Sequence, residues 1–234
     1  MAGAGHPADP PGPHPAVRLL RGAVPTPRRT PFTVAYLALL LGTTLLARFG
    51  DPVRVHRLQA LSSTDVHNLL HHPAPALLAS GLWVAGPIWT PYLWAFALTV
   101  APLERRVGAG PAAAVFVAGH VGATLLSQGV VLASVAAGRL SPDLLDALDI
   151  GVSYGVLACL GALAGLLRPR ARAAVLAAAA VYVAQSSLLG ADPVTVTGHP
   201  AALLAGIALW RPLRRRIRPG PPRTAGRPAL PSHA

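Results

Sequence analysis

The feature that most constrains this 234-residue sequence is a long stretch, residues 66–103, that contains no Arg, Asp or Glu. A membrane-spanning helix needs about 20 mostly apolar residues. The stretch is too long for one span, and prolines interrupt it at Pro73, Pro75, Pro87 and Pro91. Hydrophobic residues make up 53% of the chain and charged residues only 12%, which is not the composition of a soluble domain. The sequence therefore predicts an all-α, polytopic membrane protein.

Stretches without Arg, Asp or Glu predict six membrane-spanning helices. They cover residues 31–47, 89–103, 111–138, 150–167, 173–191 and 194–210. The outer loop 48–88 contains an amphipathic segment at 52–70, expected to lie on the membrane surface, and a shallow, partly embedded segment at 74–87. Residues 1–30 and 211–234 are rich in Pro and Arg and lack apolar periodicity. They are predicted to be disordered tails on either side of a membrane domain at 31–210.

The arginines indicate how this domain is oriented. All 20 basic residues are Arg, and a six-span topology places 16 of them on the side of the two tails. The opposite side holds four Arg and six of the eight acidic residues. The positive-inside rule puts the Arg-rich side in the cytoplasm. We therefore expect a multi-pass protein of the cell membrane, in contact with the lipid bilayer, with both termini cytoplasmic.

Several function classes find no support in the sequence. The single cysteine, Cys159, cannot form an intrachain disulfide. The net charge of +12 suits a nucleic-acid partner only on a soluble domain with a basic face, and none is present. No Walker or dinucleotide fingerprint occurs, so no nucleotide cofactor is expected. No predicted span contains a carboxylate, which makes a transporter the least supported membrane function.

The histidines outside the last span receive structural interpretations. His67 and His71 share a helix face, and His72 follows them, but the glutamate of the metalloprotease motif is missing. We therefore expect no metal and interpret them as interfacial side chains. His120 lies nine residues into the third span, about 14 Å from its cytoplasmic end at ~1.5 Å per residue. We interpret it as a buried neutral histidine bonded to a carbonyl group, remote from the outer face.

Ser153 and His199 are the candidate catalytic residues. Ser153 lies four residues past Asp149, or about 6 Å below the outer boundary of the fourth span. His199 lies seven residues past Asp192, or about 10 Å into the sixth span. Both spans run inward from the outer face, so the two side chains have similar depths. A serine bonded to a histidine is the smallest arrangement that activates a hydroxyl nucleophile.

Small residues around these two positions favour close packing of the fourth and sixth spans. Gly198, Ala202 and Gly206 follow one another at four-residue spacing, and Gly151 and Gly155 form a similar pair beside Ser153. Such ridges let helix backbones approach closely in membranes. A purely structural role for these glycines remains open.

Three segments together resemble the rhomboid intramembrane serine proteases. They are Gly151-Val152-Ser153, the run Gly198-His199-x-x-Ala-Leu-Leu-Ala-Gly, and Leu103-Glu104-Arg105-Arg106-x-Gly108. The resemblance covers residues 53–210 and implies a six-helix bundle that opens outward and cleaves membrane-anchored proteins. It implies that Ser153 is the nucleophile and His199 the general base, with Gly151 and Tyr154 at the oxyanion pocket. Backbone N–H groups at the start of the fourth span would help to hold the oxyanion.

The sequence departs from the family pattern at two places. Tyr154 stands where Gly-x-Ser-Gly has its second glycine, so its phenol either crowds the nucleophile or lines the pocket. The positions of the family's His-x-x-x-Asn fall near Ile88 and Tyr92. Loss of one oxyanion donor costs about 10² to 10³ in rate. Two functions therefore stay open: an intramembrane serine endopeptidase, or an inactive pseudoprotease of a divergent, actinobacterial-type branch that binds transmembrane segments.

Overall fold

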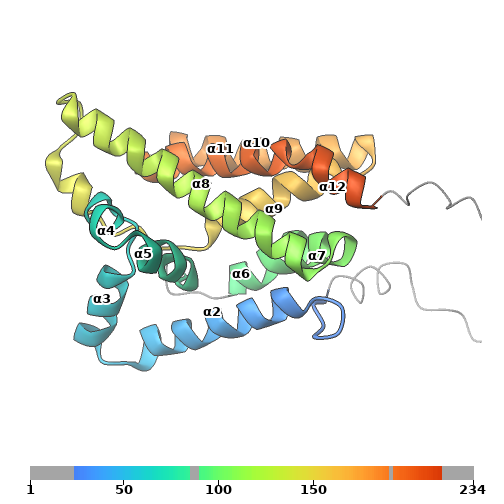
Figure 1. Cartoon of the computed structure of the whole chain (residues 1–234), viewed down its shortest axis with the longest axis horizontal. Coiled ribbons are helices and arrows are strands. Elements are labelled where there is room, and N and C mark those ends of the chain that lie inside the picture. Colours follow the sequence, from blue (N-terminus) through green and yellow to red (C-terminus); the bar gives the residue numbers. More distant parts are fainter. Residues whose placement is uncertain (1–23, 85–89, 190–191, 218–234) are drawn as a thin grey trace, which may run out of the picture.

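A computed structural model describes residues 24–84, 90–189 and 192–217, apart from the side chains of Ser186 and Ser187. Most of the two predicted tails falls outside these residues, as do Pro87, Ile88 and Trp89. Every regular element within the described ranges is helical. Figure 1 shows that the described chain begins and ends at the same end of the molecule.

The elements follow one another in the order α2 Pro31–Phe49, α3 Pro52–Leu61, α4 Val66–His71, α5 Pro73–Ala79, η1 Ser80–Leu82, α6 Thr90–Ala95, η2 Phe96–Val100, α7 Ala101–Val107, α8 Ala109–Ala136, η3 Pro142–Asp146, α9 Ser153–Gly165, α10 Pro169–Leu188, α11 Pro193–Ala208 and α12 Trp210–Ile217. Three helical stretches are long and apolar enough to cross a membrane, namely α2, α8 and the continuous run Pro193–Ile217. The protein is thus a polytopic helical membrane protein, and the count of six spans stays a prediction.

Helix α9 lies at the centre and packs against both α8 and α11, which also pack directly against each other. It has only 13 residues, and 11 of them are buried. Small residues make the close approach possible: a Cβ at Gly206 would lie 2.0 Å from the Ala158 carbonyl oxygen, and one at Gly119 would lie 2.0 Å from the Ala158 Cβ. Because α9 is enclosed by protein, it needs no lipid-facing surface of full membrane length.

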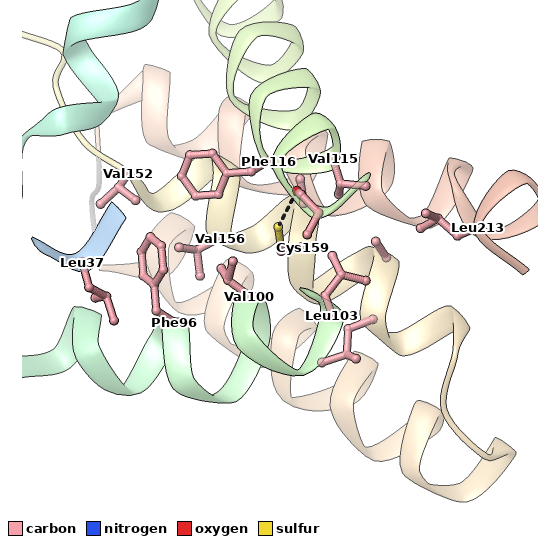
Figure 2. Packing of buried hydrophobic residues seen from close by; sticks show 14 of the residues in the cluster. Leu37, Phe96, Val100, Leu103, Val115, Phe116, Val152, Val156, Cys159 and Leu213 are labelled. Carbon is pink, nitrogen blue, oxygen red and sulfur yellow. Dashed lines mark hydrogen bonds between the residues drawn. The ribbon is translucent and has the colours of Figure 1, made fainter. Parts of the chain in front are cut away.

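Aromatic and branched side chains fill the space between α9 and the helices of the second predicted span (Figure 2). This span runs from α6 through η2, a π-helical turn, into α7, so it ends later than the predicted Leu103. Phe96 in the π-turn is fully buried, and its ring stacks on Tyr36 of α2 with 5.5 Å between centroids. Gly108, with φ of +86°, ends α7 and lets the chain turn directly into α8.

Glu104 joins the end of the second span to the start of the first. Its side chain is 1% exposed. The carboxylate accepts hydrogen bonds from the backbone N–H groups of Phe32 at 2.8 Å and Thr33 at 2.9 Å, and from the Thr33 hydroxyl at 2.6 Å. These N–H groups belong to the first turn of α2, where a helix has no internal acceptor and where its dipole favours a negative charge. Glu104 therefore fixes α2 against α7.

The predicted amphipathic segment 52–70 consists of two helices, α3 and α4, rather than one. Each has an aspartate at its N-cap: Asp51 accepts from the Arg54 N–H, and Asp65 accepts from the Asn68 N–H. Between the helices the chain turns to reach the loop before α9, where Thr64 N–H donates to the Asp149 carbonyl at 2.8 Å. The outer loop is thus tied to the start of α9.

The structure also differs from the predicted tail boundaries. Helix α12 continues to Ile217, although the sequence analysis placed the start of the disordered tail at 211. The reason is that Leu213 is buried in the core and Arg214 Nε donates to the Gly165 carbonyl at 2.8 Å. At the other end, Thr30 is fully buried and its hydroxyl donates to the Thr26 carbonyl at 3.0 Å, so this part of the predicted tail is ordered.

Candidate active site

Ser153 and His199 meet at the N-terminal end of α9. The His199 Nε2 atom lies 3.2 Å from the Ser153 Oγ atom. Ser153 is the first residue of α9, and Gly151 precedes it with φ of +151°, a conformation that glycine adopts without strain. Both side chains line a cavity of about 190 Å³. The cavity gives the serine hydroxyl access to a ligand or to water.

Two tyrosines hold the His199 ring. Tyr182 of α10 stacks on it with 5.6 Å between centroids, and Tyr154 meets it edge-on at 5.7 Å. The His199 Nδ1 atom is buried without a hydrogen-bond partner among the residues that the structure describes. The arrangement is therefore a pair of Ser and His without a third, orienting carboxylate, and aromatic packing fixes the ring instead.

Tyr154 lies between α9 and α11 rather than above the serine. Its hydroxyl donates to the Val194 carbonyl at 2.9 Å. Its ring occupies the space beside Gly198, where an added Cβ would lie 2.1 Å from the phenol oxygen. Of the two possibilities that the sequence left open, the geometry favours lining of the pocket, because the phenol is bonded to the backbone of α11. A larger residue at position 198 would overlap the Tyr154 ring, so the close packing of this tyrosine requires glycine there.

Asp149 also lines the cavity, although in the sequence it marks only the outer boundary of the fourth predicted span. Its carboxylate accepts from the Thr64 hydroxyl at 3.0 Å and from the Gln128 amide at 2.9 Å. Burial raises the pKa of this carboxyl, and the hydrogen bonds from Gln128 and Thr64 act in the opposite direction. Thr64, Asp149 and Ser153 all line the same cavity. Thr64 gave no signal in the sequence, because its contact with Asp149 joins residues far apart in the chain.

His120 lies closer to the candidate site than its depth suggested. It is buried, and its Nε2 atom lies 3.1 Å from both the Leu77 carbonyl oxygen and the Ser80 hydroxyl. The contact with a carbonyl group fits the interpretation of a structural histidine. However, His120 also lines the cavity of Ser153. Because α9 has only 13 residues, Ser153 lies about 18 Å from the C-terminal end of this helix at ~1.5 Å per residue, close to the depth of about 14 Å expected for His120.

The other histidines and the remaining glycines take structural positions. The rings of His67 and His71 stack at 4.4 Å, and within the described ranges no group of three His, Cys, Asp or Glu side chains is placed to hold a metal. Gly155 abuts the Phe116 ring, at 2.5 Å from an added Cβ. Ala202 is fully buried on α11 between Gly198 and Gly206.

Comparison with known proteins adds the family. The family model described as Rhomboid-like protein matches residues 26–219. This chain belongs to the rhomboid-like family. Comparisons with curated proteins and with solved structures gave no match. The family membership agrees with the resemblance carried by Ser153, His199 and Glu104, and it covers all the described helices from α2 to α12.

The rhomboid-like bundle leaves backbone donors at the start of α9. The first N–H groups of a helix have no acceptor within it, and here the intrahelical bonds begin with Val156 N–H to the Val152 carbonyl. Among the residues that the structure describes, the N–H groups of Ser153 and Tyr154 therefore have no backbone acceptor, and they lie beside the Ser153 hydroxyl. The Gly151 N–H is not, because it donates to the Ser80 carbonyl at 3.0 Å. On the second span Tyr92 lines the cavity, and Ile88 lies outside the described residues.

Proposed function

We propose that this rhomboid-like protein is an intramembrane serine endopeptidase in which Ser153 is the nucleophile and His199 the general base. The observation that carries the proposal is the 3.2 Å contact between His199 Nε2 and Ser153 Oγ in a shared cavity. A general base must lie within hydrogen-bond reach of the proton that it removes. The expected substrates are membrane-anchored proteins of the cell membrane, whose chains enter the cavity from the outer side.

In the proposed reaction His199 transfers protons, Ser153 attacks the peptide bond and backbone N–H groups bind the oxyanion. His199 Nε2 takes the hydroxyl proton while Ser153 Oγ bonds to the carbonyl carbon of the scissile peptide. The N–H groups of Ser153 and Tyr154 donate to the oxyanion that forms, and the α9 dipole adds to their effect. His199 then passes its proton to the leaving amine as the C–N bond breaks. A water molecule, deprotonated by His199, hydrolyses the acyl-enzyme and restores the serine.

A fluorophosphonate probe tests the nucleophile directly, because it reacts covalently with an activated serine hydroxyl. Purified wild-type protein in detergent should be labelled, whereas Ser153→Ala should show no labelling and His199→Ala a large loss. Ser141→Ala is the matched control, since its residue is exposed and, among the described residues, its hydroxyl donates only to Asp143. If the folded wild-type protein stays unlabelled, or if Ser153→Ala is labelled equally, the proposal is wrong.

A second candidate is a rhomboid-like pseudoprotease that binds transmembrane segments. The observation that favours it is the second span, where Tyr92 lines the cavity at the place expected for an oxyanion-binding asparagine. Under this alternative, capture of a membrane-anchored client by Ser153→Ala matches that of the wild type, and no cleavage product forms. Loss of client capture in Ser153→Ala speaks against it.

A further inference from the structure

Three arginines converge at the end of the bundle opposite Ser153. Arg106 of α7, Arg172 of α10 and Arg214 of α12 line a cavity of about 560 Å³, together with the last turn of α9 and Ile217. None of the described residues that line it is acidic. The cavity lies about 18 Å from the candidate active site along α9, at ~1.5 Å per residue. It is therefore a separate site.

Two of these arginines are held in place by the C-terminal end of α9. Arg172 donates from Nε to the Ala164 carbonyl at 3.2 Å and from Nη2 to the Leu167 carbonyl at 3.0 Å. Arg214 donates from Nε to the Gly165 carbonyl at 2.8 Å. Both guanidinium groups lie against the Trp210 ring, at 5.2 and 5.3 Å from its centroid. Their positions are thus fixed before any ligand binds.

The arginines keep donors for a ligand. A guanidinium carries five N–H groups. Contacts within the described part of the chain use two of them at Arg172 and one at Arg214, and Arg106 uses one for the Pro102 carbonyl in its own helix. The neighbouring carboxylate, Glu104, is already bonded to the first turn of α2. Three positive charges that line one cavity attract an anion.

We propose that Arg106, Arg172 and Arg214 bind a phosphate group, carried by an anionic phospholipid or free in solution. The planar guanidinium fork matches the geometry of phosphate oxygens and forms strong charge-assisted hydrogen bonds with them. The surroundings suit a lipid headgroup, because Trp210 is typical of the membrane interface and basic residues are attracted to anionic leaflets. A bound phosphate joins α7, α10 and α12, and the proposal is independent of proteolysis.

Lipid binding by the purified full-length protein tests this site. Native mass spectrometry with phosphatidylglycerol, with phosphatidylcholine as reference, gives apparent Kd values for wild-type and variant proteins. Arg106→Gln should weaken phosphatidylglycerol binding by about tenfold, since one charge-assisted hydrogen-bond donor is lost. The triple variant, which combines Arg106→Gln, Arg172→Gln and Arg214→Gln, should lose the preference for phosphatidylglycerol over phosphatidylcholine. The single variant Arg106→Gln should fold even if the triple variant does not, because the hydrogen bond that it removes, to the Pro102 carbonyl, lies within α7.

The matched control removes three arginines from the same end but outside the cavity, as Arg168→Gln, Arg170→Gln and Arg215→Gln. Undiminished binding in the control supports the site, whereas equal weakening in both triple variants overturns it in favour of general surface charge. Unchanged binding in Arg106→Gln also overturns it. If inorganic phosphate displaces phosphatidylglycerol from the wild type but not from Arg106→Gln, the result supports a site that free phosphate also fills. Binding of phosphatidylglycerol that phosphate does not displace supports a lipid-specific site.

Discussion

Replacing Gly206 by alanine tests whether the contact between α9 and α11 sets both stability and the candidate site. An added Cβ lies 2.0 Å from the Ala158 carbonyl oxygen and 2.8 Å from the Ala162 nitrogen. Both are backbone atoms, so no side-chain rotation relieves the overlap. Ordinary contact begins near 3.4 Å, and the helices must therefore separate locally by about 1.4 Å, the difference from 2.0 Å. Overpacking of this kind costs about 1–3 kcal/mol, and a clash between backbones belongs at the upper end.

The same displacement reaches the candidate active site, because His199 lies two helical turns from Gly206 on α11. The contact between His199 Nε2 and Ser153 Oγ measures 3.2 Å, and lengthening it by even half of that separation exceeds hydrogen-bond range. Fluorophosphonate labelling of Gly206→Ala should therefore slow by tenfold or more under conditions in which the variant is still folded.

Unfolding in mixed micelles with increasing sodium dodecyl sulfate, followed by circular dichroism, measures the change in free energy of unfolding. Gly122→Ala is the matched control, since a Cβ at Gly122 meets nothing within 4 Å. This control should be neutral or stabilising by up to about 1 kcal/mol, because alanine favours the helix more than glycine. If Gly206→Ala unfolds and labels like Gly122→Ala, the packing argument is wrong.

Three further substitutions follow from single contacts. Glu104→Ala leaves the buried N–H groups at the start of α2 without an acceptor and should lower the free energy of unfolding by about 3 kcal/mol, with Glu104→Gln losing less in the same titration. Because burial raises the pKa of Asp149, the folded protein binds its proton more tightly than the unfolded chain does, so stability should fall as pH rises above the ordinary Asp pKa. Asp149→Asn should flatten that pH dependence in unfolding measured over a pH series, and an unchanged slope would contradict the assignment. Tyr154→Gly should destabilise by about 3–5 kcal/mol through the space left between α9 and α11, without faster probe labelling.

The contact between Ser153 and His199 could be predicted from the sequence, because it depends on the direction of the two spans and on the number of residues from their ends. The distribution of arginines indicates the direction of each span, and the helical rise converts residue counts into depth. Helix α9 begins at Ser153 itself, and α11 begins at Pro193 after the Asp192 N-cap. Two helices that run in the same direction and pack closely keep such depths comparable. His120 was predicted to lie remote from Ser153, but α9 has only 13 residues, so both side chains reach the same cavity.

Other features depend on contacts between distant segments, which leave no periodic signal. The outer loop reaches Asp149 through Thr64, and the Trp83 indole donates to the Ser62 hydroxyl at 2.9 Å. Helix α12 is only eight residues long, and four of them are Arg, so its composition resembles that of a tail. Its helical state depends on burial of Leu213 and on the bond from Arg214 to α9.

The two departures from the family pattern carry different weight once the structure is considered. Tyr154 is accommodated by Gly198 and bonded to the Val194 carbonyl, so a glycine at 154 would leave space in the helix interface rather than relieve the nucleophile. The replacement at Tyr92 is of another kind, because no described side chain of the second span supplies a histidine or asparagine donor to the cavity. In the proposed protease, stabilisation of the oxyanion would then depend on the N–H groups of Ser153 and Tyr154. The proposed protease should therefore cleave slowly but keep a reactive serine. The Ser–His contact activates the hydroxyl independently of the oxyanion donors.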